Sequence, residues 1–380
     1  MADVAFAAAQ TDFAVGLLRE AAAISNASAI LSPISIALAL SLAYAGAGVD
    51  TRREFERAFA RGANTGDTLD AAFHRTFSQL TENKYCVALE LVNRVYTAHD
   101  LHVKAAYREL LAANFGAAFQ QVDFERQPEE AVAEINEFVA NATHQKIRDL
   151  LSPDDVDYDT RMMLVNAVYF KGEWDELFSE ERTTDETFFV DENNERQVKM
   201  MKQEINGVKY TDTDHVQVLE LPYADKAAKF TVFLPKKKCG LSAWLQKVDG
   251  AELLDLMDRM HYTKVDVGRA AAVQDEAEFK LKEMLEKLGF SEGFNEKTAN
   301  FNGISVERLY ISEGFHKAFI EVNEKGSEAA AATALIMARV SSAIQYSEEP
   351  ARFRADRPFA FLISRERIPL FFGRFMGPSL

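Results

Sequence analysis

The chain is poor in cysteine, with only Cys86 and Cys239 among 380 residues. Two cysteines fit a reducing compartment, and inert, partly buried thiols are favoured over a disulfide or metal ligands. The N-terminus also lacks the features of a secretion signal or membrane span, because Asp3 replaces a basic start and Gln10 and Asp12 interrupt the apolar residues. We therefore expect a cytoplasmic protein, with unconventional release left open.

No Pro-rich or Gly/Ser-rich tract, long charge block or internal repeat divides the sequence. The chain of 380 residues is 48% hydrophobic, which is enough to bury a large core. These features predict one large domain over residues 1–380.

Positive charge is also scarce, since the formal net charge is -16 and the sequence pI is near 5.0. Such a balance opposes binding to nucleic acid or to anionic lipid. The one dense basic run, Lys236 to Lys238, follows Phe233-Leu234-Pro235. A solvated turn at a strand end is favoured there over a polyanion site.

Sequence signatures of enzymes are missing as well. There is no nucleophile elbow, P-loop, paired metal-ligand motif or zinc-type cysteine spacing. Gly46-Ala47-Gly48 lacks a third glycine and follows an apolar helix pattern, which indicates a turn and not a dinucleotide site. We expect no catalytic residue, metal or cofactor, and a protein that is not an enzyme.

Helix and strand patterns are both present, in irregular order. Ser32-Pro33 supplies an N-cap and a first-turn proline ahead of an apolar helix. Further helices are predicted at the N-terminus and at about 67–81, 104–115, 128–143, 241–259 and 280–288. Strands are predicted at about 88–96, 163–170, 216–221, 230–234, 318–322, 359–363 and 369–375. This order predicts an α+β fold with mostly antiparallel sheets.

The segment from Glu324 to Ser341 permits two interpretations. Its Ala, Leu, Met and Glu residues are strong helix formers, so propensity alone predicts a helix. As a strand, it would place Ser327, Ala329, Ala331 and Thr333 on one uniformly small face. Such a strand could enter a packed sheet without forcing a bulky side chain into the core, and Gly326 would allow the chain to fold back.

The stretch from Glu324 to Ala334 resembles the hinge of the reactive loop of serpins. Other stretches resemble serpin motifs in the expected order over nearly the whole chain: Ser32–Ser35, Asn166–Trp174, Phe301–Ile304, His316–Phe319, Asp356–Phe359 and Phe372–Pro378. The segment between Ser342 and Arg357 is similar to that of the leaderless intracellular group.

The resemblance implies the serpin fold: three mostly antiparallel sheets, about eight or nine helices and an exposed reactive-centre loop at about 324–350. It implies a loop hinge comprising Glu324, Gly326, Ser327, Glu328, Ala329, Ala330, Ala331 and Ala332. It also implies a polar cluster where the central sheet opens, comprising Ser32, Ser35, Asn166 and His316, with Trp174 at the upper end of the opening. On residue type alone, His316 would be a core histidine.

One position departs from the family pattern. Ala272 falls where serpins often have a lysine that pairs with the glutamate equivalent to Glu324. Arg269 could substitute, or the hinge could be held more loosely, and the sequence does not decide between them.

The resemblance implies a monomeric suicide inhibitor of serine proteases, which traps the acyl-enzyme when its cleaved loop inserts into the central sheet. Usual spacing from Glu324 puts the reactive bond at Val340-Ser341, which suits an elastase-like protease. The alternative, Arg339-Val340, suits a trypsin-like one. Papain-like cysteine proteases remain open as targets. A serpin that does not inhibit, acting as a carrier, storage protein or chaperone, is the competing class. Such serpins often carry a charged or bulky residue or a proline in the hinge, and none is present at Ser327 or at Ala329 to Ala332.

Overall fold

The structure is a computed structural model that describes residues 2–60, 69–81, 87–115, 119–270, 273–327 and 349–378. Nine α-helices lie within these residues: α1 Ala2–Ile24, α2 Pro33–Ala45, α3 Val49–Ala60, α4 Leu69–Thr81, α5 Ala105–Phe115, α6 Pro128–Ala142, α7 Leu241–Leu245, α8 Gly250–Asp258 and α9 Lys282–Lys287. The helices alternate irregularly with strands, as the α+β prediction requires.

A six-stranded sheet forms the centre of the molecule. Its order is β10, β11, β12, β4, β2, β3, with bounds β10 Val273–Lys280, β11 Glu313–Asn323, β12 Gly326–Ser327, β4 Met162–Glu173, β2 Val87–Ala98 and β3 Phe119–Val122. Most neighbours are antiparallel, but β11 also pairs directly with β4 in parallel. This parallel pair lies in the middle of the sheet, where the site described below is found.

A second, nine-stranded sheet has the order β1, β15, β14, β8, β7, β6, β9, β13, with β5 also on β6. Its strands are β1 Ala29–Leu31, β5 Thr184–Phe189, β6 Glu195–Asp212, β7 Val216–Pro222, β8 Ala228–Pro235, β9 His261–Ala270, β13 Ala351–Ala355, β14 Phe359–Arg365 and β15 Ile368–Phe375. Two of the three expected sheets are joined here, because the 18-residue β6 pairs with β5 and β9 along one part and with β7 along another.

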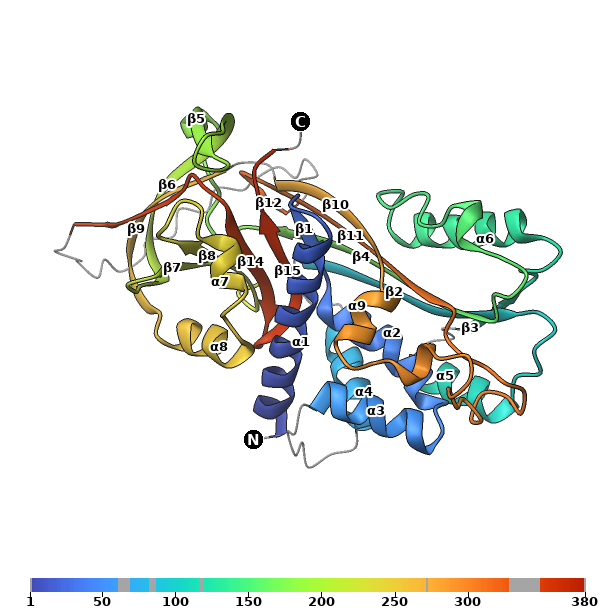
Figure 1. Cartoon of the computed structure of the whole chain (residues 1–380). Helices are drawn as coiled ribbons and strands as arrows, with labels where there is room; N and C mark the ends of the chain where they lie inside the picture. Colours follow the sequence, from blue (N-terminus) through green and yellow to red (C-terminus); the bar gives the residue numbers. More distant parts are fainter. Residues whose placement is uncertain are drawn as a thin grey trace.

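Each face of the central sheet packs on its own core. On β4, the even positions Leu164, Val168 and Phe170 belong to the core shared with α2 and the second sheet. The odd positions Val165 and Tyr169 belong to the core under α6. The alternation follows from the two-residue period of a strand. Figure 1 shows α6 on one side of β2, β4 and β11 and α2 on the other.

Helix α2 is buried along its whole length from Pro33 to Tyr44. Such a helix must be apolar on all sides, and Ile, Leu and Ala fill most of its positions. The predicted N-cap is confirmed, since the Ser32 hydroxyl accepts from the Ser35 backbone N–H at 3.4 Å. The cap fixes the start of α2 directly beneath the central sheet.

Every helix and strand predicted from the sequence overlaps an observed one. The predicted helix at 241–259 is two helices, because Asp249 caps a new one by accepting from the Glu252 N–H at 2.8 Å. Strand β6 was not predicted, since its many charged residues alternate with buried ones on a half-exposed strand. Lys236 to Lys238 follow the end of β8, and Lys236 pairs with Asp212 at 2.7 Å.

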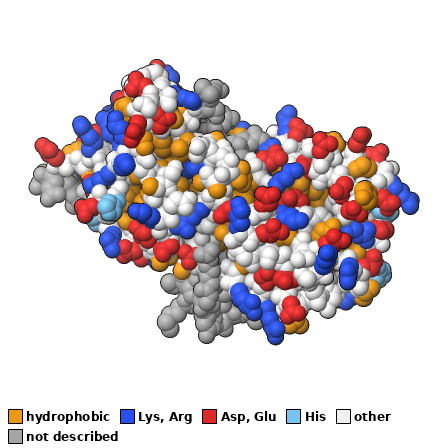
Figure 2. Space-filling view, viewed as in Figure 1, with side chains coloured by type: hydrophobic (Ala, Val, Ile, Leu, Met, Phe, Trp, Pro, Cys, Tyr) orange, Lys and Arg blue, Asp and Glu red, His pale blue; other side chains and the backbone are white. Residues whose placement is uncertain are grey.

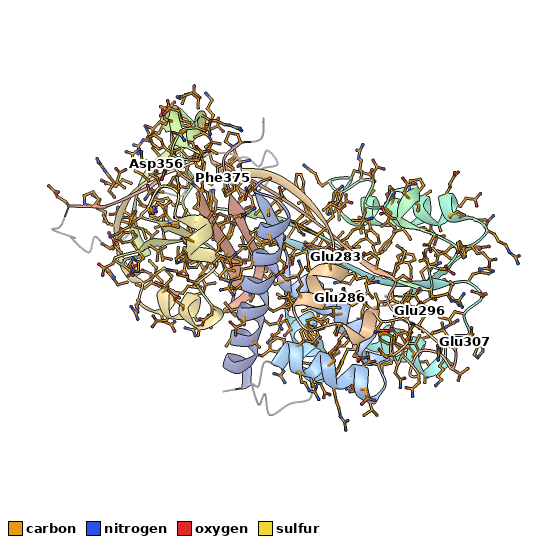
Figure 3. The ribbon with its side chains drawn as sticks, viewed as in Figure 1. Glu283, Glu286, Glu296, Glu307, Asp356 and Phe375 are labelled. Carbon is orange, nitrogen blue, oxygen red and sulfur yellow. The ribbon has the colours of Figure 1, made fainter. Side chains whose placement is uncertain are left out.

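Acidic and basic side chains are interspersed over the face shown in Figure 2. Glu283 and Glu286 on α9 and Glu296 and Glu307 beyond it lie on one half of the molecule, whereas Asp356 and Phe375 lie on the other (Figure 3). No helix in the described ranges is both long and apolar enough to cross a membrane.

Candidate functional site

The central sheet holds a short strand, β12, between the C-terminal ends of β11 and β4, which we call the upper ends. Ser327 pairs with Val322 of β11 and with Gly172 of β4, and both pairings are antiparallel. Gly326 likewise pairs with Asn323 and Glu173. For Gly326 and Ser327, the strand interpretation of the hinge is therefore the observed one.

Glycine is required at position 326. Its φ of +143° lies in a region that other residues rarely adopt, and a Cβ there would lie 2.1 Å from the Gly172 carbonyl oxygen. The close approach allows the chain to turn back from β11 and enter the sheet beside β4.

The side chain of Ser327 is fully buried. Its hydroxyl is 2.8 Å from the Tyr223 hydroxyl, and the Tyr223 ring stacks on Trp174 with centroids 4.7 Å apart. Trp174 Nε1 donates to the Asn323 carbonyl at 2.8 Å, and its backbone N–H donates to Lys325 at 2.9 Å. Trp174 thus lies at the upper end of the parallel pair and anchors the hinge turn.

Glu324 is held by a hydroxyl group. Its Oε1 accepts from Thr183 Oγ1 at 2.8 Å, and its carbonyl accepts from the Phe178 N–H at 2.9 Å. Among the described residues its carboxylate makes no ion pair. Ala272 lies outside the described residues, and the structure provides no description of the Arg269 side chain. Thr183 thus supplies one hydrogen bond to the carboxylate of the hinge glutamate.

Directly below β12, the parallel pairing of β11 with β4 closes the sheet. It runs from Glu313 opposite Met163 to Ile320 opposite Phe170. His316 stands opposite Asn166 in this register. Any strand that extends β12 downward must separate these two residues.

A hydrogen-bonded cluster, which we call the latch, joins the strands at this level; it comprises Ser32, Ser35, Asn93, Asn166 and His316. The Ser32 N–H donates to His316 Nε2 at 3.1 Å, so the proton of the neutral ring is on Nδ1, which donates to Asn166 Oδ1. Asn166 Nδ2 donates to Ser35 Oγ at 2.5 Å and to Asn93 Oδ1. The structure thus brings the four predicted polar residues together.

Asn93 is the latch residue that sequence reasoning missed. It stands opposite Asn166 in the antiparallel register of β2 with β4. A polar residue in the otherwise apolar run Leu91-Val92-Asn93 was the available signal. Pairing it with Asn166 required the strand register, which the sequence does not give.

Burial of His316 lowers the pKa of its imidazole from 6.5 to about 3. The native state therefore keeps the ring neutral, while the unfolded state binds a proton below pH 6.5. The contribution of His316 to the free energy of unfolding is therefore fully present above pH 6.5 and is lost as the pH falls toward 3. We expect a loss of about 2 kcal/mol by pH 5, since one pKa unit corresponds to about 1.4 kcal/mol. Urea unfolding at pH 7.5 and 5.0 measures this loss.

The control is His316→Gln, which keeps an uncharged polar side chain. It should be less stable than wild type at pH 7.5 but should lose about 2 kcal/mol less on acidification. An equal loss in the two proteins would show that other groups cause the pH dependence.

The remaining predicted site residues lie outside the described residues. These are Glu328, Ala329, Ala330, Ala331 and Ala332 of the hinge, and Arg339, Val340 and Ser341 at the reactive bond. The fold and the described site are those of a protein with a closed central sheet, a latch at its middle and the start of an additional strand at its top.

Comparisons with known proteins identify that class. The family model for Serpin (serine protease inhibitor) matches residues 8–378. Serpin B6 of Pongo abelii is 32% identical, over 98% of this chain and 99% of the relative. Leukocyte elastase inhibitor of Equus caballus is 33% identical, over 97% and 98%. The solved structure of Serpin48 from Tenebrio molitor, described as a highly specific serpin, matches with a TM-score of 0.88 at 27% identity, over 100% of both chains.

The chain belongs to the serpin family. It is therefore grouped with protease inhibitors and not with enzymes. The serpin fold predicted from the sequence motifs is confirmed.

Proposed function

We propose that this protein is a suicide inhibitor of serine proteases that traps the acyl-enzyme by inserting its cleaved loop into the central sheet. The observation that carries the proposal is β12, which already pairs with β11 and β4 above the point where those strands pair directly. The loop that follows Ser327 is thus connected to the place where a new strand would enter.

The proposed reaction begins as ordinary proteolysis. The protease serine oxygen attacks the carbonyl carbon of the reactive bond, and the C–N bond breaks as the leaving amine takes a proton. The residues up to the cut remain esterified to the protease. Because the loop is then no longer joined to the chain on its C-terminal side, it can extend β12 between β11 and β4.

The observed register predicts which residues meet during insertion. Ser327 lies opposite Val322 and Gly172, so six residues further along, Thr333 would lie opposite both His316 and Asn166. Its hydroxyl would face the same side as Ser327 and could accept and donate hydrogen bonds in place of those broken in the latch. Ala329 and Ala331 would share that face, where only small side chains fit the packed core.

Insertion would exchange one parallel ladder for two antiparallel ladders. Parallel pairing is slightly less stable per residue, and β12 is antiparallel to both neighbours. About a dozen added hydrogen bonds at about 0.5 to 1.5 kcal/mol each give a gain of order 10 kcal/mol. About 15 inserted residues would span about 50 Å, enough to carry the tethered protease across the molecule. Distortion of the protease's oxyanion hole would then stall deacylation.

For the reactive bond we propose Val340-Ser341, with Arg339-Val340 as the alternative. The first would suit an elastase-like protease and the second a trypsin-like one. The similarity to a protein named leukocyte elastase inhibitor supports the elastase-like target. Papain-like cysteine proteases are a further possible class.

Incubation with an elastase-like and a trypsin-like protease tests the proposal. We expect a complex that survives SDS, because the acyl bond is covalent, together with a C-terminal fragment whose mass shows that it begins at Ser341. Val340→Asp should abolish the reaction with the elastase-like protease, whereas Arg339→Gln should leave it unchanged. A fragment that begins at Val340 would assign the alternative bond.

Cleavage without a covalent complex would contradict inhibition. It would favour the competing proposal, a serpin that acts as a carrier, storage protein or chaperone. As part of the proposal, the protein is a single serpin domain over residues 1–380 that acts as a cytoplasmic monomer. The similarity to Serpin B6 and Serpin B9 supports that location.

A further inference from the structure

The segment that joins α6 to β4, residues 143–161, lies on the face of the central sheet that packs against α6. We call it the connection. Its backbone continues directly into β4 at Met162. Its side chains, however, share a buried core with Phe315 and Phe319 of β11. The residues of the connection in this core are Leu150, Leu151 and Val156. The connection therefore contacts both strands of the parallel pair.

Two lysines from the β11 side of the parallel pair also contact the connection. Lys280, at the end of β10, places its Nζ 2.6 Å from Asp155 Oδ1. Lys317 of β11 donates to the Arg148 carbonyl at 3.1 Å. Since β10 pairs with β11 along its whole length, both lysines belong to the same half of the sheet. These contacts attach the connection to the half of the sheet that does not contain β4.

The carboxylate of Asp155 is the buried member of its ion pair. The Asp155 side chain is 7% exposed, whereas that of Lys280 is 60% exposed. The second carboxylate oxygen accepts from the N–H and the hydroxyl of Ser152, at 2.8 and 2.7 Å. Burial raises the pKa of Asp155, but the bonds from Lys280 and Ser152 outweigh it and lower that pKa. Because the Ser152 bonds do not involve Lys280, replacing Lys280 removes the ion pair and leaves the turn at Asp155 in place.

A strand that enters between β11 and β4 must move the two halves of the sheet apart by one strand spacing, about 4.8 Å. The connection is continuous with β4 and would move with it, so Asp155 would separate from Lys280. Lys280 stands opposite Phe315 in the register of β10 with β11. This position is one residue below His316, where the inserted Thr333 would lie. The ion pair must therefore break as the inserted strand passes the latch.

We propose that Lys280 is a positioning residue that slows insertion of the loop. Its ion pair with Asp155 holds the connection, and with it β4, against the half of the sheet formed by β10 and β11. This inference rests on the proposed function and adds a residue that sets the rate of the insertion step. In the intact protein the same pair opposes separation of β11 from β4.

A synthetic peptide with the sequence of residues 328–340 tests opening of the sheet without any protease. We expect it to enter between β11 and β4 below β12, and the fluorescence of Trp174 at the upper end of this pair to report its entry. The peptide should enter Lys280→Gln about fivefold faster than wild type. A hydrogen bond between charged groups is worth about a factor of ten or more, and the exposure of Lys280 reduces this.

Further variants distinguish loss of the ion pair from a general disturbance. Asp155→Asn keeps an oxygen that can accept from Ser152, and it should also be about fivefold faster. The double variant should be no faster than either single variant, because both changes remove the same contact. Lys280→Arg keeps the pair and should match wild type, as should Lys297→Gln, which alters an exposed lysine. A wild-type rate in Lys280→Gln, or additive effects in the double variant, would overturn the proposal.

Amide hydrogen exchange of the intact protein separates this inference from the proposed function. Residues 150–156 should exchange about fivefold faster in Lys280→Gln than in wild type, because the connection opens more often. If exchange is faster but the peptide enters neither protein, the proposed function fails, while the attachment of the connection by Lys280 stands. If exchange and peptide entry both match wild type, Lys280 has no such role, and trapping of a protease would still support the proposed function.

Discussion

Replacing Ser327 with arginine is expected to convert the protein from an inhibitor into a substrate. Ser327 is fully buried between β11 and β4, with its hydroxyl on Tyr223. In the native state an arginine at position 327 can lie outside the sheet, because the pairing of β11 with β4 from Glu313 to Ile320 does not depend on β12. The inserted state must bury it, and an unpaired buried charge costs several kcal/mol.

The expected consequence is that the protease hydrolyses the acyl-enzyme before the loop inserts. Each 1.4 kcal/mol added to the insertion barrier slows insertion about tenfold, while deacylation by the protease is unaffected. The yield of complex that survives SDS should therefore fall at least tenfold, with cleaved protein in its place. Gel densitometry against active-site-titrated protease measures the yield.

Two variants control for this experiment. Ser327→Ala removes only the hydroxyl, at a cost of about 1 kcal/mol, and should still form the complex. Lys325→Gln alters an exposed residue of the same turn and should trap protease like wild type. Undiminished trapping by Ser327→Arg would mean that Ser327 does not need to enter the sheet.

Much of the fold could be predicted from local signals. Ser32 and Pro33 mark the start of α2, and the small residues after Gly326 allowed a strand interpretation, which is the observed one for Gly326 and Ser327. The resemblance at these motifs identified the family and four of the five latch residues, Ser32, Ser35, Asn166 and His316. These features can be predicted from the sequence because each depends on residue type and spacing within a short segment.

Contacts between distant segments could not be predicted from the sequence. Thr183 bonds to Glu324 across 141 positions of the sequence, and no local pattern indicates that partner. Asn93 joins the latch only through the register of β2 with β4. The parallel direction of β11 on β4, on which the energy of insertion depends, is likewise a property of the assembled sheet.

Cleavage of the loop between Met337 and Ser342 is expected to stabilise the protein strongly. In the intact chain β11 and β4 share one parallel ladder below β12. Once cut, the loop could add two antiparallel ladders worth about 10 kcal/mol. For 380 residues the entropy of unfolding is about 0.8 kcal/mol per kelvin, so the Tm should rise by about 12 °C.

The most direct test of the account is calorimetry of the protein before and after this single cut, made by a protease that the protein does not trap. The account predicts that the nicked form unfolds at least about 10 °C above the intact form. A nicked form that unfolds at the same or a lower temperature would contradict it, because no free energy would then be available to trap a protease.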